Sequence, residues 1–292
     1  MGTPPYRLLT ADTPADLAAL VRVATAFLAK RESSNNLQLA VLDQVARGRY
    51  QGALLVGAED AHGDLVALLL RTPPHPLLVP DGNDQAALAL LLDWFALHDA
   101  ALPGVVGPLP QAGAVADAWA ERHALEVRLA LHEGVYRLRR VLDTPRAAGS
   151  MRSVTGADRD LVLAWLTAFE RDAFGAPRSD PERTWASFQG DASRSLVLWQ
   201  DPEGAPVSLA GVPGRTPSGA RIGPVYTPPQ LRGRGYAEAL VAALCAHELA
   251  RGARQCFLYT DLANRTSNEL YERVGFTRIG EAAEFRFEPV TG

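Results

Sequence analysis

The sequence predicts an α/β chain in which one unit of strands and helices occurs twice. In the C-terminal half, an apolar strand, a loop with two glycines and an amphipathic helix follow one another directly over residues 222–249. A second apolar strand and a further helical segment come next, and the same order occurs earlier in the chain. Alternating strands and helices are typical of α/β domains, and self-similarity at a fixed offset indicates a duplicated unit.

The repeat is clearest at the end of each half. Glu272–Phe276 aligns with Glu121–Leu125, which lies 151 residues earlier. Other expected elements align at similar offsets, so we interpret the chain as two copies of one α/β unit. The alternative is a chance likeness between helices that are rich in Ala and Leu. The corresponding elements are the opening strands 6–10 and 151–155, the strand pairs 52–58 with 66–71 and 195–200 with 207–212, the strands 77–80 and 222–227, the helices 85–98 and 236–249, and the strands 105–109 and 257–260.

The loop Gln230–Gly235 has the pattern Q-x-x-G-x-G between a strand and a helix. Its two glycines let the backbone turn tightly and approach a ligand closely. The helix that begins near Tyr236 leaves its first N–H groups unpaired. Together with the helix dipole and the side chains of Arg232 and Arg234, these groups form a site for an anion such as a pyrophosphate. For this motif alone, a glycine-rich turn that binds nothing is the alternative.

A second motif follows at the distance that one helix and one strand require. It runs from Asn264 to Phe276 and reads N-x-x-S-x-x-L-Y-x-x-x-G-F. With both motifs in this order, residues 150–288 resemble the GNAT superfamily of acetyl-CoA-dependent N-acyltransferases. The segments VYTPP, RGRGYA, YTDLAN and LYERVGF also resemble a bacterial subfamily of predicted acetyltransferases with tandem GNAT units. One departure is Arg265, where that subfamily usually has proline, and it affects only the expected start of the local helix.

The resemblance implies a fold and a set of binding residues. Each unit would be a mixed, mostly antiparallel twisted sheet flanked by helices. In the C-terminal unit, the strand before the glycine loop would part from its parallel neighbour, with acetyl-CoA between them. The Val225 N–H would stabilise the oxyanion of a tetrahedral intermediate, which requires a fixed donor. The residues implied to bind acetyl-CoA are Val225, Thr227, Gln230, Arg232, Gly233, Arg234, Gly235, Tyr236, Ala237, Asn264, Ser267 and Tyr271.

Tyr271 is the expected general acid. A phenol with its ordinary pKa near 10 stays protonated at neutral pH and can deliver a proton to a departing thiolate. A buried aromatic that anchors the helix to the sheet is the alternative. The general base stays open: Glu170, Asp172 and Asp261 are candidates, although carboxylates are usually solvated surface groups, and a chain of water molecules could serve instead.

The first copy lacks the residues of both motifs. Pro80–Asp84 stands in the place of Gln230–Gly235, so carboxylates replace guanidinium groups and would repel a pyrophosphate. The boundary is expected near Asp143–Ser150, which has linker composition. We therefore expect a degenerate, non-catalytic GNAT-like unit over 1–145 that covers or braces a catalytic unit over 146–292. Three polar residues of the second motif, Asn264, Ser267 and Tyr271, correspond to Gly113, Ala116 and Ala120.

Composition restricts the class of protein. A hydrophobic fraction of 47% is ample for packed cores. The net charge of −4 does not favour nucleic acid as a partner, and the six histidines lack metal-ligand spacing. The sequence shows no signal-peptide pattern and no apolar run of the roughly 18 residues that a spanning helix needs. We expect a cytoplasmic monomer or homodimer without a metal and without nucleic-acid or membrane partners.

These observations predict the transfer of an acetyl or short acyl group from acetyl-CoA to a primary amine. The amine would attack directly, through a tetrahedral intermediate, because neither Cys245 nor Cys256 lies in a motif that would activate a thiol. A covering N-terminal unit favours a small-molecule acceptor over a peptide N-terminus. The alternative is a non-catalytic acyl-CoA-binding sensor or assembly module, which would not need the proton donor Tyr271. Recognition of a protein partner by the N-terminal unit also stays open.

Overall fold

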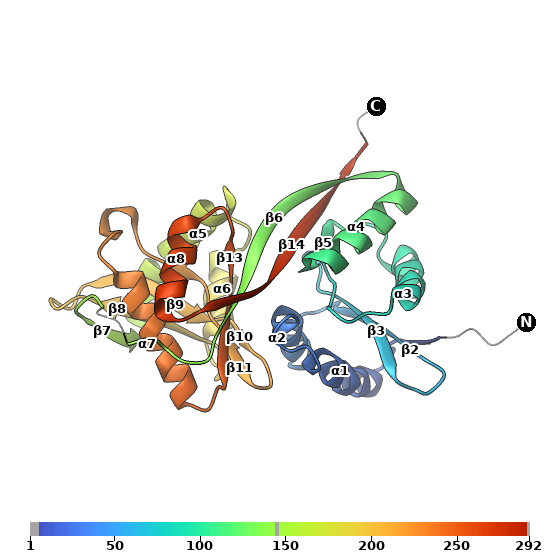
Figure 1. Ribbon diagram of the computed structural model, residues 1–292, viewed down its shortest axis with the longest axis horizontal. Helices are drawn as coiled ribbons and strands as arrows, with labels where there is room; N and C mark the ends of the chain where they lie inside the picture. Colours follow the sequence, from blue (N-terminus) through green and yellow to red (C-terminus); the bar gives the residue numbers. More distant parts are fainter. Residues whose placement is uncertain (1–5, 144–145, 291–292) are drawn as a thin grey trace, which may run out of the picture. The chain divides into compact units, whose positions relative to one another are not determined.

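The computed structural model describes residues 6–143 and 146–290, and the contacts within it divide the chain into two units (Figure 1). Unit 1 contains the described residues up to Val135 together with those from Ile279 onward. Unit 2 contains the described residues of Tyr136–Arg278. Each unit has its own order of strands and helices, and the two orders correspond. The expected α/β class with two similar units is confirmed.

Unit 1 begins with a strand, two helices and a strand pair, and continues with strand, helix, strand and helix. Its strands have the order β1-β2-β3-β4-β5-β14-β6, where β14 is Thr277–Pro289 and β6 is Leu125–Leu138, and β4 and β5 are parallel neighbours. The elements are β1 (Arg7–Leu9), α1 (Pro14–Ala29), α2 (Asn36–Ala46), β2 (Leu54–Glu59), β3 (Leu65–Arg71), β4 (Leu77–Leu78), α3 (Gln85–His98), β5 (Gly104–Pro108) and α4 (Leu109–His123).

The sheet of unit 1 separates two apolar cores. Successive residues of a strand point to opposite faces, so Leu68 and Leu70 of β3 pack with α1 and α2. Ala67 and Leu69 pack with α3 and α4 instead. Figure 1 shows these two helix pairs on opposite sides of β2 and β3. The near-continuous apolar run of β3 is thus explained by burial on both faces.

Unit 2 repeats this order with one additional short hairpin. One sheet has the antiparallel order β12-β9-β8-β7, while β10 pairs with β11 and β11 pairs in parallel with β13. The elements are β7 (Ser150–Ser153), η1 (Gly156–Asp158), α5 (Arg159–Phe174), α6 (Pro181–Phe188), β8 (Ser195–Gln200), β9 (Pro206–Val212), β10 (Gly214–Arg215), β11 (Gly219–Arg221), β12 (Val225–Tyr226), η2 (Pro229–Leu231), α7 (Tyr236–Ala250), β13 (Gln255–Asp261) and α8 (Arg265–Val274).

Unit 2 has the same two-sided packing. Leu196 and Leu198 of β8 pack with residues of α5 and α6. Val197 and Trp199 of the same strand pack with α7 and α8. Two helix pairs therefore cover the two faces of the strands in each unit, which is what the sequence repeat predicts.

Two long strands contribute residues to both units. β6 (Leu125–Leu138) and β14 (Thr277–Pro289) each cross the division between the units. Ala282–Arg286 of β14 pairs antiparallel with β5, so the last strand of the chain completes the sheet of unit 1. The contacts thus group residues differently from the boundary that the repeat places near 143–150. Thr144 and Pro145 of that expected linker lie outside the described residues, and the division of roles between 1–145 and 146–292 stays a prediction.

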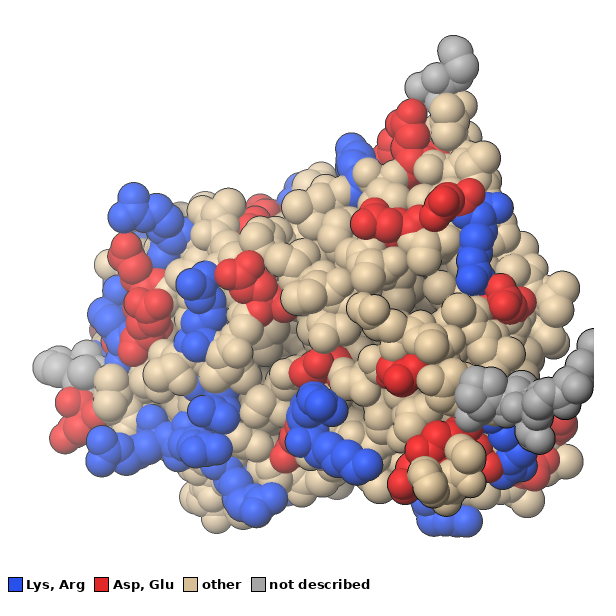
Figure 2. All heavy atoms as spheres, turned by 45° about the vertical axis from the view of Figure 1, so that its right-hand side comes forward, with Lys and Arg blue, Asp and Glu red and all other residues tan. Residues whose placement is uncertain are grey.

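Acidic and basic side chains are intermingled on the face of the molecule that Figure 2 presents. Mixed signs keep the electrostatic potential of a surface low, because opposite charges cancel over short distances. Within the described residues, every helix is too short or too polar to cross a bilayer.

Candidate functional site

The chain segment before the glycine loop changes partners within a few residues. At its start, β11 pairs in parallel with β13, and the Ile222 N–H donates to the Phe257 carbonyl oxygen (2.7 Å). Immediately afterwards the Gly223 N–H donates to the Gly211 carbonyl oxygen (2.9 Å), and β12 pairs antiparallel with β9. The single strand expected over 222–227 is therefore interrupted. Pro224 contributes to the break because it has no N–H for the β13 ladder, and β12 and β13 end in different sheets.

The register of β12 determines where the Val225 backbone points. Val225 lies opposite Ala210, and beside this pair the Gly211 N–H donates to the Pro224 carbonyl oxygen (3.1 Å). In an antiparallel ladder this arrangement marks a pair that is not hydrogen-bonded to each other, so the Val225 N–H and C=O point away from β9. They face the side on which β13 has separated. A backbone donor is thereby held rigidly at the point where the strands part.

Two side chains hold the end of β12 in place. The hydroxyl of Ser208, which is fully buried, donates to the Tyr226 carbonyl oxygen (3.0 Å) and lies 2.9 Å from the Thr227 hydroxyl. The Arg232 Nε–H donates to the Thr227 carbonyl oxygen (2.9 Å). The sequence does not predict this role of Ser208, because it is a single polar residue inside an apolar strand. The Thr227 carbonyl oxygen is thus already hydrogen-bonded within the loop, by Arg232.

The glycine loop leads into α7 as the motif predicts. Gly233 (φ 75°) and Gly235 (φ 78°) both adopt the left-handed conformation that favours glycine. Gly235 is the N-cap of α7, and no side chain of the described residues caps this helix. The N–H groups at the start of α7, which include those of Tyr236 and Ala237, are therefore available to an anion.

Two guanidinium groups lie at this loop. Arg232 bonds the carboxylate of Asp172 on α5 (2.6 Å), and both side chains are about half exposed. Arg234 is exposed, and its guanidinium approaches the Gln230 carbonyl oxygen at 3.5 Å. The pairing of Arg232 with Asp172 links α5 to the loop. No sequence pattern predicts this ion pair, because the two residues lie 60 positions apart.

One carboxylate in the first turn of α7 is neutralised within the unit. Glu238 accepts from the Arg273 Nε–H (2.8 Å), and its side chain is 14% exposed. This pair ties α7 to α8. An anion at the start of α7 would consequently meet a compensated charge at Glu238 and an exposed cationic side chain at Arg234.

The start of α8 is organised by Asn264. Its side-chain oxygen accepts from the Ser267 N–H (3.1 Å), which makes Asn264 the N-cap of the helix. That cap uses only the oxygen of the side-chain amide. Arg265 is the first residue of α8, so the departure from proline leaves the helix start intact. Whether Asn264 and Ser267 contact acetyl-CoA stays a prediction.

Tyr271 lies in the core that α7 and α8 share, with 8% of its surface exposed. Its ring meets that of Phe276 edge to face at 6.0 Å. Burial raises the pKa of Tyr271, with a smaller contribution from the thiol of Cys245. The phenol therefore stays protonated across the physiological range. Cys245 and Cys256 are free and buried.

Two of the three candidate bases accept hydrogen bonds from backbone N–H groups of nearby turns. Glu170 accepts from the backbone N–H groups of Arg178 (2.7 Å) and Ser179 (3.0 Å), which fastens the segment after α5. Asp261 accepts from the Ala263 N–H (2.8 Å) in the turn before α8. Asp172 is the candidate that the structure brings to the glycine loop, where it is paired with Arg232.

Unit 1 has a different arrangement at the corresponding place. The Val79 N–H donates to the Val106 carbonyl oxygen (2.9 Å), so the chain after β4 stays paired with β5. A Cβ on Gly107 would lie 2.2 Å from the Val79 carbonyl oxygen, which shows how closely the strands approach. Asp84 caps α3 by accepting from the Ala87 N–H (2.9 Å). A carboxylate of the chain thus occupies the helix start that unit 2 leaves open.

Known proteins resemble the chain in sequence and in fold. Residues 203–286 match the family described as FR47-like protein. A mycothiol acetyltransferase from Thermobispora bispora is 47% identical over 60 residues, which are 20% of this chain and 20% of that protein. The match therefore spans about a fifth of the relative's length.

Two solved structures show the fold over nearly the whole chain. A GCN5-related N-acetyltransferase from Sphaerobacter thermophilus has a TM-score of 0.61 and 21% identity, covering 100% of this chain and 99% of that one. A tandem GNAT protein from the clavulanic acid biosynthesis pathway has a TM-score of 0.58 and 14% identity, covering 98% and 99%. At these identities the likeness concerns the fold. Residues 203–286 thus match the FR47-like family, and the chain as a whole has the fold of these two GNAT proteins.

Proposed function

We propose that unit 2 transfers an acetyl group from acetyl-CoA to the primary amine of a small molecule. The start of α7 carries this proposal. There Gly235 is the N-cap in a left-handed conformation, and no described side chain satisfies the first N–H groups. A helix start of this kind binds anions, and the diphosphate of CoA is the anion that a GNAT protein would place there.

The residues around the loop fit the other parts of such a ligand. Gly233 and Gly235 bring backbone N–H groups close to a phosphate, and Arg234 extends beside them. Asn264 and Ser267, at the start of α8, would contact the pantetheine arm. Acetyl-CoA supplies an acetyl thioester, whose carbonyl carbon is open to attack by an amine.

Val225 would stabilise the charge that develops during attack. Its N–H points away from β9 toward the side where β13 has separated, and the β12–β9 ladder fixes its direction. Because this N–H is already oriented, the protein would not need to reorganise when the thioester carbonyl oxygen becomes negative. Losing one donor of this type typically slows turnover by about 10²–10³-fold.

Tyr271 would deliver a proton to the leaving thiolate. Its pKa is raised by burial, so the phenol carries its proton when the thiolate departs. Proton transfer from a positioned side chain contributes about 10²–10⁴-fold to rate. No covalent enzyme intermediate is proposed, because Cys245 and Cys256 are both buried within the core.

The acceptor is proposed to be a small amine. The relative with 47% identity over 60 residues is a mycothiol acetyltransferase, and its identity supports a metabolite over a protein. The unacetylated form of mycothiol is therefore the first acceptor to test, followed by a panel of amino acids and simple amines.

Calorimetric titration with acetyl-CoA tests the donor site. The full chain should bind one acetyl-CoA, and Gly235→Glu should abolish binding because it places a carboxylate and a strained φ at the start of α7. Gly204→Glu is the matched control, since Gly204 (φ 86°) has the same conformation in the β8–β9 turn. Release of free CoA on adding an amine then tests transfer.

The outcomes separate the possible roles. Binding that disappears only in Gly235→Glu, followed by CoA release with an amine, supports the transferase. Binding without CoA release across the amine panel would instead support an acyl-CoA sensor. Two acetyl-CoA molecules per chain would show that unit 1 also binds the donor. A folded protein that binds none would exclude the proposal.

A further inference from the structure

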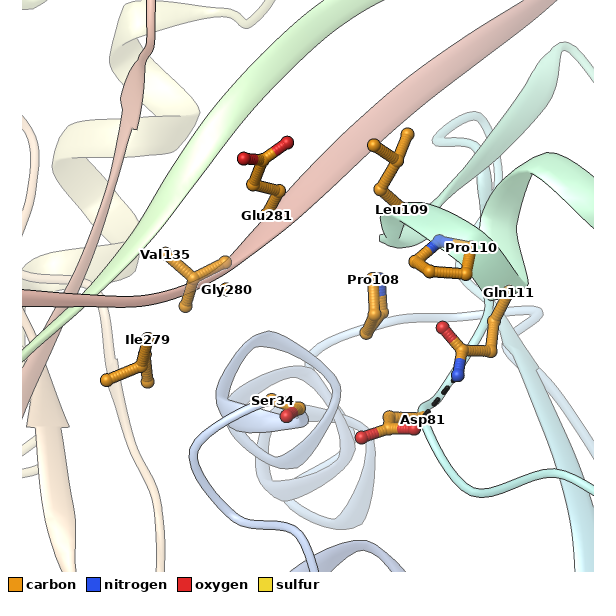
Figure 3. A pocket seen from close by; sticks show the side chains of 10 residues that line it. All are labelled: Ser34, Asp81, Pro108, Leu109, Pro110, Gln111, Val135, Ile279, Gly280 and Glu281. Carbon is orange, nitrogen blue, oxygen red and sulfur yellow. Dashed lines mark hydrogen bonds between the residues drawn. The ribbon is translucent and has the colours of Figure 1, made fainter.

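Unit 1 contains a cavity of about 400 Å³ at the carboxyl ends of its parallel strands β4 and β5 (Figure 3). Ligands of open α/β sheets commonly bind at this edge, and the volume is within the range of small-molecule sites. The cavity is distinct from the glycine loop of unit 2. Its lining residues are Ser34, Asp81, Pro108, Leu109, Pro110, Gln111, Val135, Ile279, Gly280 and Glu281.

The lining has apolar walls and a polar corner. Val135 and Ile279 lie on one side of the cavity in Figure 3, opposite Pro108. Asp81 and Gln111 form the polar corner and are joined by a hydrogen bond from the Gln111 Nε2 to the Asp81 Oδ1 (3.0 Å). That bond turns the amide oxygen of Gln111 away from Asp81.

Asp81 is held rigidly by a buried side chain. The Asp81 N–H donates to the Asn35 Oδ1 (2.7 Å), and the Asn35 Nδ2 donates to the Asp81 carbonyl oxygen (3.1 Å). Asn35 is fully buried. The carboxylate is thus presented from a fixed backbone, which lowers the entropy cost of binding a ligand to it.

The charge of the lining has one sign. It includes the carboxylates of Asp81 and Glu281, and no Lys, Arg or His occurs among the described residues that line it. The Glu281 carboxylate is paired with His132 (2.7 Å). Arg31 approaches the other oxygen of Asp81 only to 3.9 Å, and its side chain is half exposed to solvent. Asp81 therefore dominates the potential in the polar corner.

We propose that this cavity binds a small organic cation, namely a primary ammonium group on a compact apolar body. An ammonium has three N–H donors, and the corner offers three acceptors in the Asp81 carboxylate, the Gln111 amide oxygen and the Ser34 hydroxyl. The apolar body would pack between Val135, Ile279 and Pro108. The same carboxylates would repel acyl-CoA, so unit 1 would have a ligand of opposite charge to the donor of unit 2.

Cyclohexylammonium, cyclohexanol and cyclohexanecarboxylate are suitable probes because they share a body and differ in charge. Titration of the full chain, followed by calorimetry, should show saturable binding of the ammonium and at least tenfold weaker binding of the other two. Asp81→Asn should weaken the ammonium by about tenfold or more, the usual effect of losing a charged hydrogen-bond partner. Asp84→Asn is the matched control, since it removes the same charge three residues away, outside the lining.

A second arm separates this cavity from the acceptor site proposed for unit 2. Binding of the ammonium should be unchanged in Gly235→Glu and Tyr271→Phe and should persist with saturating CoA. Equal binding by wild type and Asp81→Asn would overturn the proposal. So would equal affinity for all three probes, loss of binding in the unit 2 variants, or no binding to the folded wild type at millimolar concentration.

Discussion

The guanidinium of Arg232 in the glycine loop bonds the carboxylate of Asp172 on α5 at 2.6 Å. This pair places one of the expected phosphate-binding cations in contact with one of the candidate bases. Each residue therefore affects the other's proposed role. Replacing Asp172 separates the two roles, because donor binding and turnover are measured independently.

We expect Asp172→Asn to strengthen acetyl-CoA binding by a few-fold at low salt. The carboxylate no longer competes for Arg232, and exposed ion pairs are worth about 0–1 kcal/mol. Calorimetry at low and high salt measures the effect, which should fade as salt screens the charges. Unchanged turnover at saturating acetyl-CoA would exclude Asp172 as the base, whereas a large loss would support it. Weaker donor binding would show that the pair orients Arg232 usefully.

Tyr271→Phe should lower turnover by about 10²-fold or more at saturating acetyl-CoA, because only the proton donor is removed. The affinity for acetyl-CoA should change little. Tyr136→Phe is the control: it removes a buried hydroxyl that donates to Asn268 (2.9 Å) in the same unit. That variant should lose about 1 kcal/mol of unfolding free energy and keep its turnover. Equal turnover in both variants would indicate that Tyr271 only anchors α8 to α7 and is not the proton donor.

Asp84→Ala should destabilise the chain by about 1 kcal/mol and leave acetyl-CoA binding unchanged. The change removes the N-cap of α3, whose usual contribution is of this size. Asp93→Ala, also on α3, breaks an exposed ion pair with Arg122 of α4 and should have a smaller effect. Denaturant unfolding measures the stability and calorimetry the binding. A changed affinity for acetyl-CoA would contradict a non-binding unit 1.

Asp158 should make stability depend on acidic pH. Its pKa is lowered, first by hydrogen bonds from Arg152 (both 2.7 Å) and then by bonds from Thr155. A carboxyl with a lower pKa in the folded state stabilises the fold above its unfolded pKa of about 4, and this contribution is lost as pH falls. The difference in unfolding free energy between wild type and Asp158→Asn should therefore shrink from about pH 5 to pH 2.

The control for this pH dependence is Asp160→Asn, which alters a carboxylate that is 95% exposed. Its unfolding free energy should parallel that of the wild type over the same range. A constant difference between wild type and Asp158→Asn down to pH 2 would mean that the Arg152 pair does not contribute.

Local sequence determined the helices and the motifs. The expected helix 85–98 matches α3, and 236–249 matches α7 to within one residue. The tight turn at Gly233 and Gly235 was also readable, because backbone conformation depends on neighbours in the chain. The duplication was visible because both copies kept the same order of elements.

Contacts between distant residues were decided only by the tertiary structure. The pairing of β14 with β5, the bond between Arg232 and Asp172 and the support of β12 by Ser208 all join segments that are remote in sequence. The cavity beside Asp81 likewise draws its lining from residues 34 to 281. Periodicity and motif spacing report what each segment prefers, whereas these contacts depend on which segments the folded chain brings together.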